Sequence, residues 1–340
     1  MANDSPRTFE DKPATRERVP IMVGLVGPSG SGKTYSALRL ATGIQRVNGG
    51  DIYMIDTEAR RGLHYAEKFA FRHVVFGAPF SPLDYLDAIQ HCVKKGAGVV
   101  IVDSMSHEHE GPGGVLEMHD EEVTRLAAAW KTSRDAVNFP AWGEPKKARR
   151  RMINTILQMP CSFVFCFRAK PKSKPGKDEN GRKTLIELGW MPIAGEEFIY
   201  EMTLNCLLEP GSGGVPTWDP GKDAPGSKEI IKLPEQFRSL FSKSVPLSED
   251  IGEALAKWAA GSGAVFRGQG EHKGKPLSTV PADVLGRYRA AIAAQPKLAG
   301  HLAEVDAEMA ARVAADANQA ADDDAPPVSD EDNPGEVAAQ

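Results

Sequence analysis

The sequence predicts an α/β domain with a mostly parallel sheet, and three observations support this fold class. Short apolar runs rich in β-branched residues alternate with segments of helical spacing along the first 208 residues. A glycine-rich segment directly follows the first of these runs. The run at 98–102 is apolar throughout, which is typical of a strand buried on both faces of a parallel sheet.

The expected elements follow one another along the chain. A first strand at 21–26 begins after Pro20 and leads, through the glycine-rich segment, into a helix at 35–45. The later elements are expected at 52–55 (strand), 82–95 (helix), 98–102 (strand), 145–158 (helix), 162–167 (strand) and 199–208 (strand). Residues 169–184 have no apolar periodicity and are expected to form a mobile basic loop.

Composition divides the chain into four segments. We expect residues 20–245 to form the α/β core, between a disordered N-terminus at 1–19 and a small, mainly helical C-terminal module at 246–317. Residues 318–340 are expected to be a disordered acidic tail, since the last twenty residues hold seven acids and no base. In contrast, residues 146–183 hold twelve Lys and Arg residues against two acids, so charge is polarised along a chain whose net charge is −5.

Cysteine usage and hydropathy indicate the compartment. The four cysteines form no CxxC pair, and no Cys/His set has the spacing of a zinc site. The N-terminus lacks the apolar stretch of a signal peptide, and no run of 18 apolar residues occurs. We therefore expect a cytoplasmic protein with buried, reduced thiols and no membrane partner.

A complete phosphate-binding loop lies between the first strand and the first helix. It matches GxxxxGK[ST] and consists of Gly27, Pro28, Ser29, Gly30, Ser31, Gly32, Lys33 and Thr34. Glycines let backbone N–H groups converge on phosphates, and the helix N-terminus adds its dipole. Lys33 is expected to pair with the β- and γ-phosphates of ATP, and the Thr34 hydroxyl to bind Mg²⁺. The sequence thus predicts a P-loop ATPase that uses ATP and Mg²⁺.

Carboxylates at the ends of two other strands extend this site. Asp103 ends the apolar run at 98–102, at the sheet edge where open α/β folds bind ligands, and is expected to hold the Mg²⁺ of the nucleotide. Glu58 follows the strand at 52–55 and is the candidate to orient and deprotonate the attacking water. Asp56 is the alternative for that role, and a solvated loop acid is the other interpretation of Glu58.

The order of these motifs resembles the RecA-like ATPase core over residues 20–208, and more narrowly the RecA-like single-strand annealing ATPases of phage recombination systems. The resemblance implies that Glu58 activates water and that Asp103–Ser104 is the Walker B pair. It also implies that the strand at 162–167 ends in a sensor of the γ-phosphate, which is usually Gln. Arg168 occupies that position and departs from the pattern, although an arginine can contact a phosphate directly.

The resemblance also implies two DNA-contacting segments, at 106–119 and 169–184. The second is favoured because its bases would neutralise phosphates; these are Lys170, Lys172, Lys174, Lys177, Arg182 and Lys183. The segment has no aromatic residue on which bases could stack, and a soluble linker is the alternative. The basic residues at 146–151 could bind DNA, face a neighbouring subunit or form a solvated helix face.

Two further features are open to interpretation. His107 and His109, with His119 nearby, could hold a metal, but a polar loop beside the γ-phosphate or DNA is favoured over a two-histidine site. The segment from Gly270 to Tyr288 partly resembles a small accessory module of phage and bacterial nucleic-acid enzymes.

The resemblance implies an ATP-hydrolysing protein that acts on single-stranded DNA in phage-type recombination, annealing or repair. If a phage encodes it, its compartment is the host cytoplasm. The implied partners are single-stranded DNA, further copies of the chain with nucleotide at the subunit interface, and a single-strand-binding protein. The alternatives are a P-loop motor or switch ATPase in DNA packaging or replication, and a small-molecule phosphotransferase.

Overall fold

The computed structural model describes residues 18–177, 182–221, 224–261, 266–273, 277 and 280–323 of the 340-residue chain. The chain divides into two compact units, one over Arg18–Ala260 and the other containing the described residues from Gly261 onward. Most of the predicted disordered N-terminus, residues 1–17, lies outside the described residues. Val19 is described, and its backbone N–H donates to Ala259 O over 2.9 Å.

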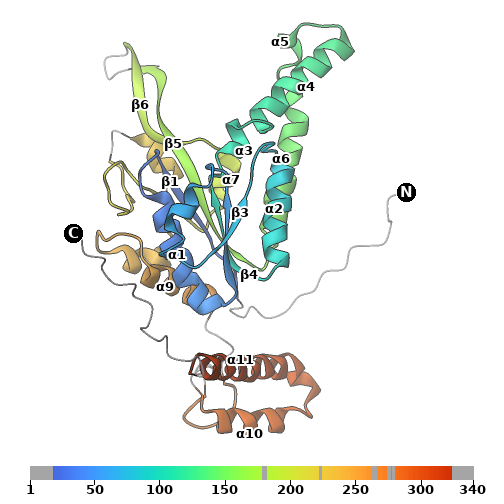
Figure 1. Ribbon diagram of the computed structural model, residues 1–340, viewed down its shortest axis with the longest axis vertical. Coiled ribbons are helices and arrows are strands. Elements are labelled where there is room, and N and C mark those ends of the chain that lie inside the picture. The colour runs from blue at the N-terminus through green and yellow to red at the C-terminus, as the bar shows by residue number, and fades with distance from the viewer. Residues whose placement is uncertain are drawn as a thin grey trace, which may run out of the picture. The chain divides into compact units, whose positions relative to one another are not determined.

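A seven-stranded sheet forms the centre of the first unit (Figure 1). Its order is β3-β2-β4-β5-β1-β7, with β6 paired to β5 off this path. All pairs along the path are parallel, and the β5–β6 pair is antiparallel. The strands are β1 (Met22–Gly27), β2 (Asp51–Asp56), β3 (Arg72–Val75), β4 (Ala97–Asp103), β5 (Ser162–Lys177), β6 (Lys183–Pro192) and β7 (Leu204–Leu207). The predicted α/β class with a mostly parallel sheet is confirmed.

Helices connect the strands and cover both faces of the sheet. Those of the first unit are α1 (Lys33–Asn48), α2 (Pro82–Lys94), α3 (His107–Glu110), α4 (Val115–Trp130), α5 (Arg134–Val137), α6 (Gly143–Ile156), α7 (Glu196–Tyr200), α8 (Pro225–Ile230) and α9 (Glu249–Ala259). Short 3-10 helices accompany them in the described part of this unit: η1 (Arg61–Tyr65), η2 (Pro140–Trp142) and η3 (Glu235–Phe241).

Alternation along the strands divides the core between the two faces. Val23 and Leu25 of β1 pack with the apolar side chains of α1 and α9. Met22 and Val26, one position away, belong to the opposite cluster, which includes the buried side chains of α2 and α6. This period of two places α1 and α9 on one face and α2 and α6 on the other.

Helix α9 packs against α1 and therefore belongs to the first unit, so the boundary between the units lies later in the chain than the sequence predicted. A side chain at Gly43 of α1 would collide with the backbone of α9 at Glu249, and one at Gly252 would collide with α1 at Leu40. Arg39 adds an ion pair with Glu249 at 2.7 Å. The sequence-based boundary at 245 assigned this helix to the C-terminal module, whereas the structure divides the chain after Ala260. Gly43 and Gly252 permit this close approach, but the sequence does not indicate which helix each of them packs against.

The segment predicted as a mobile basic loop is instead a β-hairpin over its described residues. β5 continues through Lys177 and pairs with β6 from Ala169↔Pro192 to Lys177↔Lys183. Figure 1 shows this hairpin extending beyond the rest of the sheet. Both of its faces are largely exposed along 170–175, so its sequence lacks the one-sided apolar alternation that predicts a strand. Residues 178–181 lie outside the described residues.

Other expectations also change. β3 was not predicted, because its Arg-His-Val-Val sequence forms only a short, partly exposed strand beside β2. The fifth strand, expected at 199–208, is limited to β7, and the first two of these residues belong to α7 instead. The expected loop at 106–119 contains α3 and the start of α4, which with α5 and α6 form a helical arm (Figure 1).

The second unit is helical in its described part. It contains α10 (Ala282–Ile292), η5 (Pro296–Leu298) and α11 (Ala299–Asp323). A small core of Phe266, Leu277, Leu285, Ile292 and Val305 holds these elements together. The predicted mainly helical character of this module is thus found in its described part, and residues 318–323 of the predicted disordered tail belong to α11. The remainder of that tail lies outside the described residues. Among the described residues, no helix has the length and hydropathy needed to span a membrane.

Candidate nucleotide-binding site

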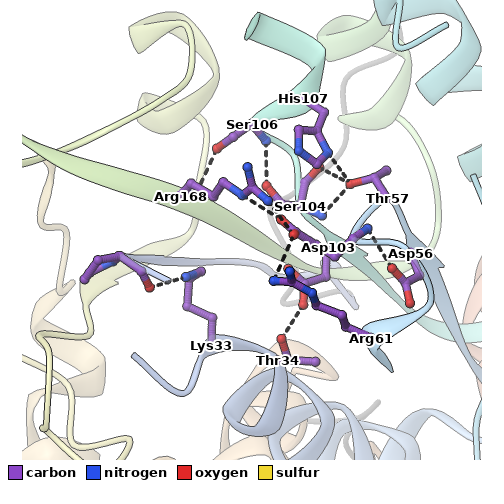
Figure 2. Close-up of polar contacts among 12 residues, drawn as sticks. Lys33, Thr34, Asp56, Thr57, Arg61, Asp103, Ser104, Ser106, His107 and Arg168 are labelled. Carbon is purple, nitrogen blue, oxygen red and sulfur yellow. Dashed lines mark hydrogen bonds and ion pairs between the residues drawn. The ribbon is translucent and has the colours of Figure 1, made fainter. Parts of the chain in front are cut away.

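The glycine-rich loop, the carboxyl ends of β2 and β4, and Arg168 within β5 surround one cavity of about 250 Å³. Gly30 and Gly32 adopt positive φ angles of 78° and 88°, which the tight turn between β1 and α1 requires. The cavity is lined by Ser29, Gly30, Gly32, Lys33, Thr34, Glu58, Arg61, His64, Tyr65, Asp103 and Arg168. The structure thus brings together the predicted Lys33, Thr34, Glu58, Asp103 and Arg168. Figure 2 shows Lys33, Thr34, Asp103 and Arg168 of this group.

The Lys33 ammonium lies against the loop itself. Its Nζ donates to Gly27 O at 2.8 Å and to Pro28 O at 2.7 Å. Lys33 is 8% exposed, and burial lowers the pKa of its ammonium. Two carbonyls therefore hold a cation inside the cavity, at the place where backbone N–H groups of the loop and helix α1 would receive phosphates.

Thr34 and Asp103 form a pair that fits Mg²⁺. The Thr34 hydroxyl donates to Asp103 Oδ2 at 2.5 Å, although the two residues are 69 positions apart. Asp103 is 4% exposed, and burial raises the pKa of its carboxyl group to about 6, while the Thr34 hydrogen bond and Lys33 oppose this shift. A hydroxyl and a carboxylate are the hard oxygen ligands that Mg²⁺ takes beside nucleotide phosphates. The peptide bond between Asp103 and Ser104 is cis.

Asp56 holds the loop after β2 in place. It accepts hydrogen bonds from Glu58 N at 2.7 Å and from Gly62 N at 2.9 Å, and it contacts His73 Nε2 at 2.9 Å. It is 2% exposed and is not among the residues that line the cavity. The geometry therefore favours Glu58 over Asp56 for activation of water, and gives Asp56 the role of a positioning residue.

Replacing Asp56 by alanine is expected to lower the free energy of unfolding by about 2 kcal/mol or more, because it leaves two backbone N–H groups of a closed loop without their acceptor. Chemical denaturation measures this effect. Asp56→Asn retains one acceptor oxygen and should restore part of the loss. Asp51→Ala is the matched control on the same strand, since it removes only an exposed ion pair with Arg72, which contributes little to stability. Equal losses in the two alanine variants would contradict the positioning role.

Glu58 is bound by an arginine across the cavity. Arg168 Nε donates to Glu58 Oε1 at 2.7 Å, and Arg168 Nη2 donates to Oε2 at 2.5 Å. The hydrogen bond to Glu58 raises the pKa of the Arg168 guanidinium. Arg61 Nη1 lies 3.9 Å from Glu58 Oε2. The candidate water-activating group therefore lies between two arginines, in a planar two-bond pair with one of them.

The histidines near the site have separate partners. His107 Nδ1 contacts Thr57 Oγ1 at 2.8 Å, His109 Nδ1 contacts Arg149 Nη2 at 3.0 Å, and His119 stacks on Trp142. No group of three or more potential metal-ligating residues occurs in the part of the chain that the structure describes. The three histidines thus have separate partners, and a polar segment near the site stays the favoured interpretation.

One residue of the basic segment 146–151 is buried rather than exposed. Arg149 donates to both carboxylate oxygens of Glu108, at 2.9 and 2.8 Å. The side chains are 8% and 4% exposed. Arg149 therefore fastens α6 to α3 and is unavailable to DNA, whereas Lys146, Lys147, Arg150 and Arg151 are exposed on α6.

Three cavity residues were missed by the sequence analysis. Arg61, His64 and Tyr65 belong to η1, which begins three residues after Glu58 and brings them to the cavity. The paired arginines that follow the Asp-Thr-Glu sequence are the only signal, and they do not reveal which of the two side chains turns inward. The Tyr65 ring also packs near Tyr35, with centroids 5.7 Å apart.

A phosphate loop between β1 and α1, with a buried aspartate beside its threonine at the end of a parallel strand, defines a P-loop NTPase. The sequence profile of a family described as "AAA domain" matches residues 19–203, which is more than half of the chain. This protein belongs to that family, whose ATPase character agrees with the predicted use of nucleotide. No curated protein matches the chain.

Proposed function

We propose that this protein binds ATP with Mg²⁺, hydrolyses it, and couples hydrolysis to single-stranded DNA in recombination, annealing or repair of the phage type. The observation that carries the proposal is the continuity of β5. A single strand, Ser162–Lys177, supplies Arg168 to the nucleotide cavity and then continues into the basic hairpin. A ligand held by the hairpin would therefore be connected to the nucleotide through one strand.

The nucleotide part of the proposal rests on the residues that share the cavity. Lys33 and the loop N–H groups hold the phosphates, while Thr34 and Asp103 hold Mg²⁺, whose charge would offset that on the phosphate oxygens. Glu58 accepts the proton of the attacking water, and Arg168 faces the γ-phosphate. Membership of the AAA domain family supports this chemistry.

The DNA part rests on charge and strand geometry. Lys170, Lys172 and Lys174 lie two positions apart on β5, a spacing of about 7 Å along a regular strand, and the pairing with β6 shifts register between Lys172 and Ser173. All three are exposed, and Lys170 lies 3.9 Å from Glu110 of α3. The hairpin's aromatic residue, Trp190, is partly buried against the core. We therefore expect contacts to phosphates rather than stacking on bases.

The test is ATP turnover with and without single-stranded DNA at two salt concentrations. We expect stimulation by DNA that weakens at the higher salt. If ATP turnover is the same with and without DNA, and DNA binding does not depend on salt, the DNA part of the proposal is wrong. The assignment of the nucleotide site would not be affected. Translocation along DNA without annealing would favour the motor alternative. Phosphoryl transfer to a small molecule would favour a phosphotransferase.

Replacing Lys170, Lys172 and Lys174 together by glutamine is expected to weaken binding to single-stranded DNA and to reduce the slope of log affinity against log salt by about 2, since each lost phosphate contact removes about 0.7. Fluorescence anisotropy over a salt series measures both quantities. The matched control replaces the exposed Lys94, Lys95 and Lys243 by glutamine, which changes net charge equally. Similar slopes for the two triple variants would show that the hairpin does not hold the DNA.

We further propose that copies of the chain assemble with nucleotide at their interface, and that a single-strand-binding protein is a candidate partner. The exposure of Arg61 at the cavity supports the first point, because an adjacent subunit could approach the nucleotide there. Sedimentation with and without nucleotide and DNA tests the assembly.

A further inference from the structure

The cavity contains one interaction that ATP hydrolysis does not need and that would oppose it. Both oxygens of Glu58, the proposed water-activating group, are bound by Arg168. We propose that Arg168 and Glu58 form a latch that the γ-phosphate opens: ATP takes the guanidinium from Glu58, and only then is the carboxylate available to water. This inference rests on the proposed function and adds a control step to the same site.

The pair is well placed to act as a latch because its two backbones are fixed. Glu58 N donates to Asp56 Oδ1 at 2.7 Å. Arg168 N donates to Ser106 Oγ at 2.8 Å (Figure 2). The Arg168 side chain is 36% exposed, whereas Glu58 is 13% exposed. Opening the latch thus requires rotation of the Arg168 side chain alone, while Glu58 stays in place.

The competitor for the guanidinium is a phosphate. Arg168 is the register partner of Gly27, the first residue of the phosphate loop, and it lines the same cavity as Lys33. A guanidinium binds phosphate through the same two-bond geometry that it uses for a carboxylate. A γ-phosphate beside Lys33 therefore offers Arg168 an equivalent partner, whereas ADP has no such group.

Arg61 completes the arrangement. Its Nη1 lies 3.9 Å from Glu58 Oε2, and its side chain is 66% exposed. When Arg168 turns to the phosphate, Arg61 remains beside the released carboxylate and keeps it at the cavity. The latch consequently makes the site respond to ATP and not to ADP.

The consequence is measurable as nucleotide selectivity. Part of the binding free energy of ATP is used to separate Arg168 from Glu58, and this cost is absent for ADP. Glu58→Gln weakens the pair, so it is expected to raise the affinity for a non-hydrolysable ATP analogue by about fivefold and to leave ADP affinity unchanged. Isothermal titration of both nucleotides with Mg²⁺ provides the ratio, and ADP binding shows that the variant is folded.

A double-mutant cycle separates the latch from simple charge repulsion between Glu58 and the γ-phosphate. In a background of Arg168→Gln, the gain from Glu58→Gln is expected to disappear, because no guanidinium remains to be released. A gain that persists in that background would show repulsion and overturn the latch. An unchanged ratio of analogue to ADP affinity in Glu58→Gln alone would also overturn it. Glu67→Gln, on an exposed residue after η1, is the matched control.

Failure of the latch and failure of the proposed function remain distinguishable. The latch is read from binding of nucleotides that are not hydrolysed, whereas the proposed function is read from ATP turnover of the unaltered protein. If the variants show the expected change in nucleotide selectivity but the unaltered protein does not hydrolyse ATP, the latch stands and the proposed hydrolysis is wrong. If the unaltered protein hydrolyses ATP but the variants show no change in selectivity, the proposed hydrolysis stands and the latch is wrong.

Discussion

Replacing Lys33 by alanine is expected to abolish detectable ATP turnover and to weaken ATP binding by at least about tenfold. Charge-assisted hydrogen bonds contribute about 1.5–3 kcal/mol each, and Lys33 would supply more than one to the phosphates. Its ammonium is also the cation that the Gly27 and Pro28 carbonyls hold inside the cavity. Titration with ATP and Mg²⁺, followed by a phosphate-release assay, measures the two effects.

The matched control is Lys94→Ala, which removes an exposed lysine at the end of α2, away from the cavity. It should leave binding and turnover unchanged. Because Lys33 is buried, its loss could also alter the loop, and thermal unfolding of the two variants separates a folding defect from a binding defect. Full activity in a folded Lys33→Ala variant would contradict the assignment of the nucleotide site.

Replacing Glu58 by glutamine is expected to lower ATP turnover by about 10²- to 10⁴-fold, the range that a positioned general base contributes. Glutamine preserves the shape of the side chain and the hydrogen bonds of the loop, but it cannot accept the proton of the attacking water. Binding of ATP should not be weakened, and the proposed release of Arg168 predicts that it is strengthened. Single-turnover hydrolysis, measured with protein in excess, reports this step without product release.

Glu67→Gln changes an exposed carboxylate nine positions later in the chain and should preserve turnover. If Glu58→Gln hydrolyses ATP at the original rate, another group must deprotonate the water. Asp56 is the sequence-based alternative, but its carboxylate is occupied by Glu58 N, Gly62 N and His73. Such a result would therefore point to a group from a neighbouring subunit.

Much of the nucleotide site was predictable because its parts are local in the chain. The phosphate loop is eight consecutive residues, and its backbone conformation depends on glycines within it, so Gly27–Thr34 could be recognised without the fold. Asp103 and Glu58 follow apolar runs that read as buried strands. Since the carboxyl ends of parallel strands meet at one sheet edge, their convergence on Lys33 followed from the α/β class alone.

The hairpin shows where sequence patterns stop being informative. Strands are recognised from one-sided burial, and residues 170–175 of β5 are exposed on both faces. Their structure is set by pairing with β6, which depends on backbone hydrogen bonds rather than on side-chain type. The sequence identified the basic charge of this segment correctly but not its form.

By itself, the sequence determined the α/β class, the phosphate loop and the carboxylates that accompany it, because short-range patterns encode these features. Only the tertiary structure decided which charged groups pair. Glu58 and Arg168 are 110 residues apart and Glu108 and Arg149 are 41 apart, yet each pair meets in a two-bond contact. Whether two charged groups pair depends on the distance between them and on their burial in the fold. Neither quantity can be derived from the positions of the two residues in the chain. For this reason Glu58 and Arg168 were each candidates from the sequence, while their pairing with one another was visible only in the fold.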